Sequence, residues 1–171
     1  ELSPPDRAQI EAGNTRRIQV KGFDVVGNTQ ISTKELLAAS GVDVDQATLE
    51  LTFTDLQEMT RAMTATYRQQ GFAVAVVQLL AQEIVDGRIV FSATEGALSK
   101  IDTKPDGLNI HVKERILAVG QAAIAPERQN ALLQADVERV VLLSAETTNH
   151  QVDGTLLPGQ NMGTTQLQLD A

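Results

Sequence analysis

The chain has 171 residues, with 14 Lys and Arg against 22 Asp and Glu, and it contains neither Cys nor Trp. Without cysteine, disulfides and zinc–thiolate sites are excluded, and a net charge of −8 argues against nucleic-acid binding, which needs Lys and Arg at the phosphates. A hydrophobic fraction of 42% is close to that of globular proteins, and the length allows one domain or two small ones.

The first predicted elements are a linker, a strand and a short helix. Residues 1–16 contain two prolines and a Gly-Asn pair, which predict a linker, and a strand is expected over residues 17–26 with a bulge at Gly22. Ser32 and Glu35 have the spacing of a capping box, in which each side chain accepts a hydrogen bond from the other residue's backbone N–H. A short helix should therefore begin at Ser32.

A second helix is indicated by a longer pattern. Thr54 and Gln57 form another capping box at its start, and Gly71 is expected to end it. Apolar residues recur at spacings of three and four and share one face of this helix: Leu56, Met59, Met63 and Tyr67. This stripe is interpreted first as core, because methionine fills irregular gaps in protein interiors. In the alternative interpretation, the two methionines and the tyrosine line an apolar groove beside the next strand.

Two strands complete this first unit. Residues 72–79 form an apolar and β-branched run, and residues 88–94 alternate between apolar and polar side chains. The loop between them, at residues 81–87, ends in Asp86-Gly87, which is a turn signal. The order strand, helix, helix, strand, strand predicts an α+β unit in which both helices cover one face of a three-stranded sheet.

The same order recurs, more weakly, after residue 97. The predicted elements are a strand at 99–103, a helix at 113–119 that Gly120 ends, a helix at 131–143, and strands at 151–156 and 164–169. The predicted fold is therefore two tandem β-α-α-β-β units, each a three-stranded mixed sheet with two helices on one face. All five aromatic residues precede residue 97, so the second core must be aliphatic and we expect this unit to be the less stable one in isolation.

Catalytic and cofactor-binding patterns are absent from the sequence. His111 and His150 are isolated from other candidate ligands, and no nucleophile elbow, phosphate loop, dinucleotide fingerprint or His-Glu-x-x-His motif occurs. Glu95 and Asp86 could be imagined as an acid–base pair, but nothing in their spacing selects them. We therefore expect a protein that is not an enzyme and that uses no cofactor and no metal.

Five segments of the chain carry a family pattern: Val-Val-Gly-Asn-Thr at 25–29, Thr-Asp-Leu at 54–56, Tyr-Arg-Gln-Gln-Gly-Phe at 67–72, Gln-Glu-Ile-Val-Asp-Gly at 82–87 and Glu-Gly at 95–96. They resemble POTRA domains, the polypeptide-transport-associated modules beside outer-membrane β-barrels, and most closely those of two-partner secretion transporters in the Omp85 superfamily. Leu-Pro-Gly at 157–159 resembles the turn that precedes the barrel in that family. The resemblance implies POTRA 1 at residues 17–97, POTRA 2 at residues 98–170, a periplasmic location, and the protein's own C-terminal outer-membrane barrel as a partner.

The resemblance also implies that the strand at residues 72–79 is an edge of its sheet. It is apolar on both faces and has neither Lys nor Pro, which usually protect edge strands. We therefore expect an unfolded exoprotein client to add to this edge through backbone hydrogen bonds. The residues expected to form the client-binding edge are Phe72, Val74, Val76 and Gln78. The alternative is that the outer face of this strand packs against the neighbouring unit or the linker.

Two other functions stay open at this point. The chain could be a POTRA segment of the general outer-membrane protein assembly machinery, which serves many barrel proteins. It could also be a structural spacer that binds no client and only separates a barrel from other periplasmic partners. Binding of an unfolded exoprotein segment would distinguish the spacer from a client-binding module.

Overall fold

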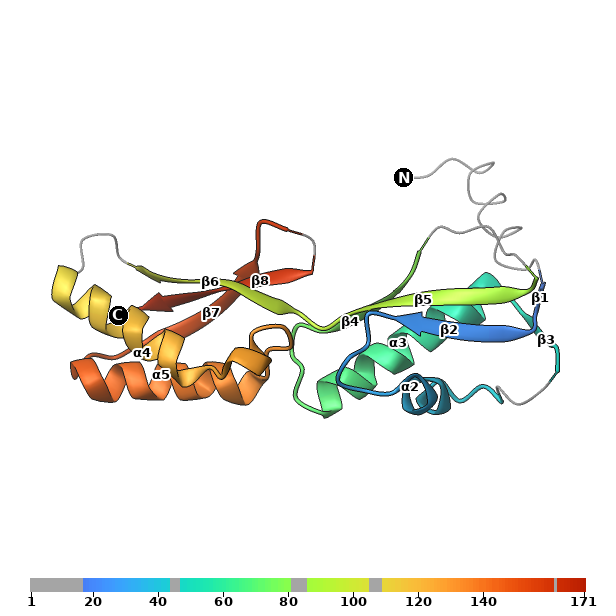
Figure 1. Cartoon of the computed structure of the whole chain (residues 1–171), viewed down its shortest axis with the longest axis horizontal. Helices are drawn as coiled ribbons and strands as arrows, with labels where there is room; N and C mark the ends of the chain where they lie inside the picture. Colours follow the sequence, from blue (N-terminus) through green and yellow to red (C-terminus); the bar gives the residue numbers. More distant parts are fainter. Residues whose placement is uncertain (1–16, 44–46, 81–85, 105–108, 162) are drawn as a thin grey trace, which may run out of the picture. The chain divides into compact units, whose positions relative to one another are not determined.

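The computed structural model describes residues 17–43, 47–80, 86–104, 109–161 and 163–171 (Figure 1). The linker predicted at residues 1–16 and most of the loop predicted at 81–87 lie outside these ranges. The chain divides into two compact units. The first consists of the residues up to Thr66 together with Val76–Thr94, and the second consists of Tyr67–Ala75 and Glu95–Ala171.

The first unit is built around a three-stranded mixed sheet. Its elements are β1 (Ile18–Val20), β2 (Gly22–Val26), α2 (Thr33–Ala39), β3 (Leu49–Leu51), α3 (Phe53–Gln69), β4 (Val76–Leu79) and β5 (Arg88–Thr94). The strand order is β2-β5-β4, with β2 parallel and β4 antiparallel to the central β5. Helices α2 and α3 lie on one face of this sheet (Figure 1). The predicted three-stranded sheet with two helices on one face is therefore confirmed.

The strand predicted over residues 17–26 is two strands that belong to different sheets. It breaks at Lys21, whose backbone N–H donates to the carbonyl of Gly87 at 2.7 Å. β1 then pairs antiparallel with β3, and Ile18 stands opposite Leu51. The prediction of a bulge at Gly22 is thus wrong, because the interruption is a change of sheet rather than an extra residue in one ladder.

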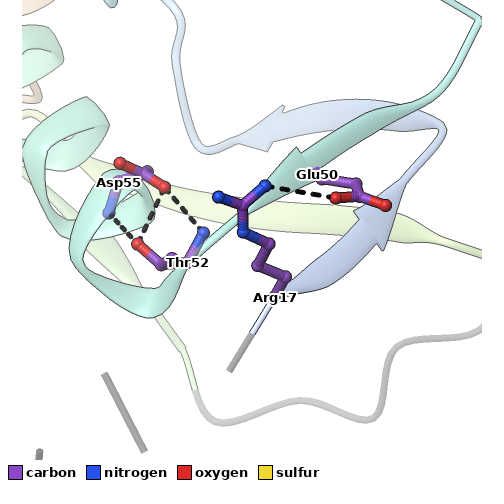
Figure 2. Close-up of polar contacts among 4 residues, drawn as sticks. All are labelled: Arg17, Glu50, Thr52 and Asp55. Atoms are coloured by element: carbon purple, nitrogen blue, oxygen red, sulfur yellow. Dashed lines mark hydrogen bonds and ion pairs between the residues drawn. The ribbon is translucent and has the colours of Figure 1, made fainter. Parts of the chain in front are cut away.

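The N-terminal cap of helix α3 lies at Thr52, two residues before the predicted one. Thr52 donates its backbone N–H to Asp55 Oδ2 at 2.7 Å, and Asp55 returns its N–H to Thr52 Oγ1 at 3.2 Å (Figure 2). The cap predicted at Thr54 and Gln57 is therefore misplaced. A carboxylate accepts a hydrogen bond more strongly than an amide does, and these bonds to Thr52 lower the pKa of Asp55. The cap predicted at Ser32 is confirmed, since its side chain accepts the N–H of Glu35 at 3.3 Å.

The edge strand β4 is shorter than predicted. Only Val76–Leu79 is extended, because a turn follows α3 and occupies the preceding residues. In this turn the N–H of Phe72 donates to the carbonyl of Tyr67 at 3.0 Å, and the N–H of Ala75 donates to the carbonyl of Phe72 at 3.3 Å. Phe72 and Val74 therefore do not belong to the strand, which corrects the range 72–79 predicted from the apolar run.

The second unit repeats the same architecture. Its elements are β6 (Ala97–Lys104), α4 (Ile110–Ala123), the 3₁₀ turn η1 (Pro126–Arg128), α5 (Gln134–Thr148), β7 (Asp153–Pro158) and β8 (Thr164–Asp170). The strand order is β6-β8-β7, again with one parallel and one antiparallel pair. Helices α4 and α5 cover one face of the sheet (Figure 1). The buried core between these two layers is aliphatic: Ile116, Ile124, Leu132, Val140, Val152, Leu167 and Leu169.

Gly120 does not end α4, as the sequence had suggested. The helix continues through it to Ala123. A Cβ at Gly120 would lie 3.1 Å from Ile101 Cδ1 and 3.5 Å from Val140 Cγ1. This glycine therefore allows α4 to approach both β6 and α5 closely. The prediction that it ends the helix was wrong, because the glycine is there to make room for these neighbouring elements. Helix α5 begins at Gln134, three residues later than predicted, and is followed by Asn149 in the left-handed region at φ 55°.

Candidate strand-docking edges

The family motif at residues 25–29 forms the turn that joins β2 to α2. Gly27 has φ 80°, and a Cβ there would collide with the carbonyl oxygen of Ala93 on β5. Asn28 then donates its side-chain amide to the carbonyl of Ile31 at 2.9 Å and to Thr33 Oγ1 at 3.1 Å. The motif therefore has a structural role, because it sets the position at which α2 leaves the sheet.

A buried hydrogen bond joins two further motifs. Tyr67, near the end of α3, donates its hydroxyl to Glu95 Oε1 at 2.8 Å, and the two residues are 0% and 6% exposed. Burial, followed by the hydrogen bond and negative charge of Glu95, raises the pKa of Tyr67 above its ordinary value. Asp86 lies at the opposite end of β5, in a turn with Gly87 where both residues have positive φ. The imagined acid–base pair of Asp86 and Glu95 is therefore not formed.

The stripe on α3 is part of the hydrophobic core. Met59, Met63 and Tyr67 are 1%, 0% and 0% exposed. Tyr67 also packs edge-on against Phe72 with a ring-centroid distance of 5.8 Å. These side chains have almost no exposed surface with which to line a groove. They therefore belong to the core, and the alternative that they line a groove is wrong.

The two histidines are at the surface. His111 Nδ1 lies 3.9 Å from Glu114 Oε2, and His150 Nδ1 lies 2.8 Å from the carbonyl of Thr148. Over the described part of the chain, no three His, Asp or Glu side chains are grouped so that they could hold a metal ion. Within the same residues, no helix has both the length and the apolar character needed to cross a membrane.

β4 is an edge strand, but one of its outward donors is occupied. Val77 points its side chain toward α3 and is 3% exposed, whereas Gln78 is exposed and Val76 half-buried on the other face. The backbone N–H of Val77 points away from β5 and donates to Thr64 Oγ1 at 2.9 Å. Phe72 is buried, and Val74 packs against the aliphatic core of the second unit. Of the four predicted edge residues, only Val76 and Gln78 lie in the strand, and their role in client binding remains a prediction.

β6, at one edge of the second sheet, is also partly capped. The N–H of Thr103 donates to Asp102 Oδ1 at 2.9 Å, and the N–H of Leu98 donates to the carbonyl of Gln129 at 2.6 Å. Between these two positions the register shifts at Leu98/Lys100. Capped donors and an irregular ladder are both features that protect edge strands from added chains.

β7, at the other edge of the second sheet, has a longer unoccupied edge. The N–H of Gly159 donates to the carbonyl of Thr164 at 2.9 Å, and this pair fixes the hydrogen-bond alternation along the strand. Gly159 faces β8, so every second residue before it also faces β8 and the residues between them face outward. The backbone N–H and C=O groups of Leu156 and Gly154 therefore point away from β8. No group in the described ranges of the chain hydrogen-bonds to these two N–H groups. This edge was not singled out by the sequence, where the run Asp-Gly-Thr-Leu-Leu-Pro looks less strand-like than residues 72–79.

Each of the two units thus has a three-stranded mixed sheet with two helices on one face. The family model described as "POTRA domain, ShlB-type" matches residues 18–96. Residues 18–96, which make up most of the first unit, therefore match a POTRA family model, as the motifs had led us to expect.

Solved structures extend the likeness in fold to the whole chain. CdiB from Escherichia coli matches with a TM-score of 0.73 at 20% identity, over 99% of this chain and 36% of that one. The N-terminal domain of Omp85 from Thermosynechococcus elongatus matches with a TM-score of 0.62 at 15% identity, over 99% of this chain and 83% of that one. A structure of POTRA1-3 of the periplasmic domain of Omp85 from Anabaena matches with a TM-score of 0.62 at 14% identity, over 90% of this chain and 65% of that one. The chain thus spans about a third of the length of CdiB, and no curated protein sequence matches it.

Proposed function

We propose that this chain is the periplasmic POTRA region of a two-partner secretion transporter in the outer membrane. In this proposal it binds an unfolded secreted exoprotein and delivers it to the barrel of the same protein. The ShlB-type family match and the likeness to CdiB support this assignment over the general assembly machinery. The region acts by binding a polypeptide rather than by catalysis.

The observation that carries the proposal is the unoccupied edge of β7. An extended client has an N–H and a C=O at every second residue along one side, and Gly154 and Leu156 offer the complementary groups. Such pairing does not depend on the client's side chains, which suits a transporter that must accept a long and varied chain. Backbone pairing over a short strand also keeps binding weak enough for release.

Binding of a synthetic strand tests this proposal. The probe is a short blocked peptide that alternates Val and Ser, titrated calorimetrically into the full chain. The matched control is the same peptide with every backbone nitrogen methylated, which removes the donors along both edges of the extended peptide. We expect the unmethylated peptide to bind and the methylated one to fail. Equal binding of both would contradict backbone pairing, and no binding of either would favour the spacer.

A proline in β7 tests the location of the pairing. Leu156→Pro removes the outward N–H, and proline is tolerated on edge strands, as Pro158 at the next outward position illustrates. Leu156→Ala is the matched control, because it loses the same packing against the core but keeps the N–H. We expect peptide affinity to fall about five- to tenfold more in Leu156→Pro than in Leu156→Ala, the effect of one hydrogen bond. Equal affinities in two variants with unchanged circular dichroism would exclude β7.

A further inference from the structure

We infer that Thr64 is a specificity-determining residue that keeps added strands off β4 and so directs the client to β7. This inference rests on the proposed function. β4 and β7 occupy equivalent positions in the two units, since each follows the second helix and pairs antiparallel with the central strand. Among the residues that the structure describes, a side chain of the same unit blocks the edge of β4, and none blocks the edge of β7.

The edge of β4 is blocked by the hydroxyl of Thr64, which both donates and accepts a hydrogen bond. Thr64 lies on the inner side of α3 and is 9% exposed. Its Oγ1 donates to the carbonyl of Thr60 at 2.8 Å and accepts the N–H of Val77 at 2.9 Å. The alternation along β4 leaves only Val77 and Leu79 directed outward. With Val77 occupied, a strand added to β4 would find a single outward N–H and could not form a regular ladder.

The equivalent helix in the second unit presents valine instead of threonine. A Cβ built on Gly154 of β7 would be 2.6 Å from Val141 Cγ2 and 3.7 Å from Val137 Cγ1, so both α5 side chains lie directly beneath this strand. A valine methyl cannot accept a hydrogen bond. The outward N–H groups of β7 are therefore left for a client. Thr64→Val gives the first unit the same chemistry as the second without a change in side-chain size.

Amide hydrogen exchange on the full chain tests the inference residue by residue. Thr64→Val is compared with the wild type and with Thr66→Val, because the Thr66 hydroxyl donates within its own helix, to the carbonyl of Ala62 at 3.1 Å. Without peptide, we expect the Val77 amide to exchange about five- to tenfold faster in Thr64→Val and to be unchanged in Thr66→Val. Thr64→Ala is a second variant that removes the hydroxyl, should the valine disturb folding.

The alternating Val/Ser peptide is then added to all of these proteins. We expect it to slow exchange at Gly154 and Leu156 in every one, and at Val77 and Leu79 only where the Thr64 hydroxyl is missing. Slowing at Val77 and Leu79 in the wild type would overturn the inference. Slowing at β7 alone in both Thr64 variants would also overturn it and would leave the proposed function intact. Slowing at no amide would contradict the proposed function, and the inference would fall with it.

Discussion

Single polar side chains satisfy hydrogen-bonding groups at or near the strands of both units. Thr64, Asp102 and Tyr67 each complete one hydrogen bond whose partner lies on a strand or just beyond one. A backbone N–H or carboxylate left unpaired in a protein interior costs more free energy than a formed bond contributes. These residues therefore stabilise their units and, on β4 and β6, remove donors that another chain could use.

Because of the pair of Tyr67 and Glu95, we expect the free energy of unfolding to depend on pH in the alkaline range. The pKa of Tyr67 is raised in the folded state, so above about pH 10 the unfolded chain loses the phenolic proton while the folded chain keeps it. The free energy of unfolding should therefore fall as the pH rises past about 10. Tyr67 is the only tyrosine and tryptophan is absent, so ultraviolet absorbance reports its ionisation directly. Absorbance that titrates at an ordinary tyrosine pKa in the folded protein would contradict the buried bond.

Replacement of Tyr67 by Phe provides the matched variant. It leaves Glu95 buried with one donor fewer, and we expect a loss of about 1–3 kcal/mol in the free energy of unfolding at neutral pH, measured by urea denaturation. The dependence on alkaline pH that belongs to Tyr67 should disappear in the same variant. An unchanged midpoint in urea would mean that the bond contributes nothing.

Two buried threonines in the second sheet should respond oppositely to the same substitution. Thr103 Oγ1 on β6 has no hydrogen-bond partner among the described residues, whereas Thr165 Oγ1 on β8 donates to the carbonyl of Leu157 at 2.9 Å. Thr103→Val removes an unsatisfied hydroxyl and should be neutral or stabilising by up to about 1 kcal/mol, while Thr165→Val should cost about 1 kcal/mol. Thermal unfolding of both variants measures the difference. A clear loss of stability in Thr103→Val would reveal a partner for its hydroxyl.

Helices and strands could be predicted from the sequence where the signal lies in neighbouring residues. The stripe on α3, the cap at Ser32 and the alternation in β5 each depend on neighbouring residues, and the structure contains all three. β3 was missed because three residues, Leu-Glu-Leu, form a strand only when β1 arrives from a distant part of the chain. Gly120 was misinterpreted for a similar reason, since its cause is the approach of Ile101 and Val140.

The candidate site was harder to predict than the fold. The family resemblance implied that residues 72–79 form an edge, and their apolar character suggested that this edge could accept an added strand. The hydrogen bond from Val77 to Thr64 joins a strand to a helix and leaves no sequence signal. The alternation that leaves Gly154 and Leu156 outward is set by the turn at Gly159 and Thr164. Which backbone groups an edge exposes is thus a property of register, and register is fixed by tertiary pairing.

At the scale of the whole molecule, charge should bias which client segments bind. The chain carries a net charge of −8, and backbone pairing itself does not distinguish side chains. A Val/Ser peptide flanked by two lysines should therefore bind more tightly than one flanked by two glutamates, because long-range attraction raises its association rate. The difference should shrink as salt rises, since charges are screened beyond about 10 Å at 0.1 M ionic strength. Equal affinities at low salt would show that the acidic surface has no part in binding.

In the proposed function, an extended chain adds to β7 as a fourth strand of the second sheet. Intermolecular nuclear Overhauser effects between the isotope-labelled chain and the unlabelled Val/Ser peptide test it most directly. We expect close contacts between the peptide backbone and the amides of Gly154 and Leu156, in the alternating pattern of a strand pair. Contacts at β4 in place of β7, or contacts to side chains without any to these backbone amides, would contradict it.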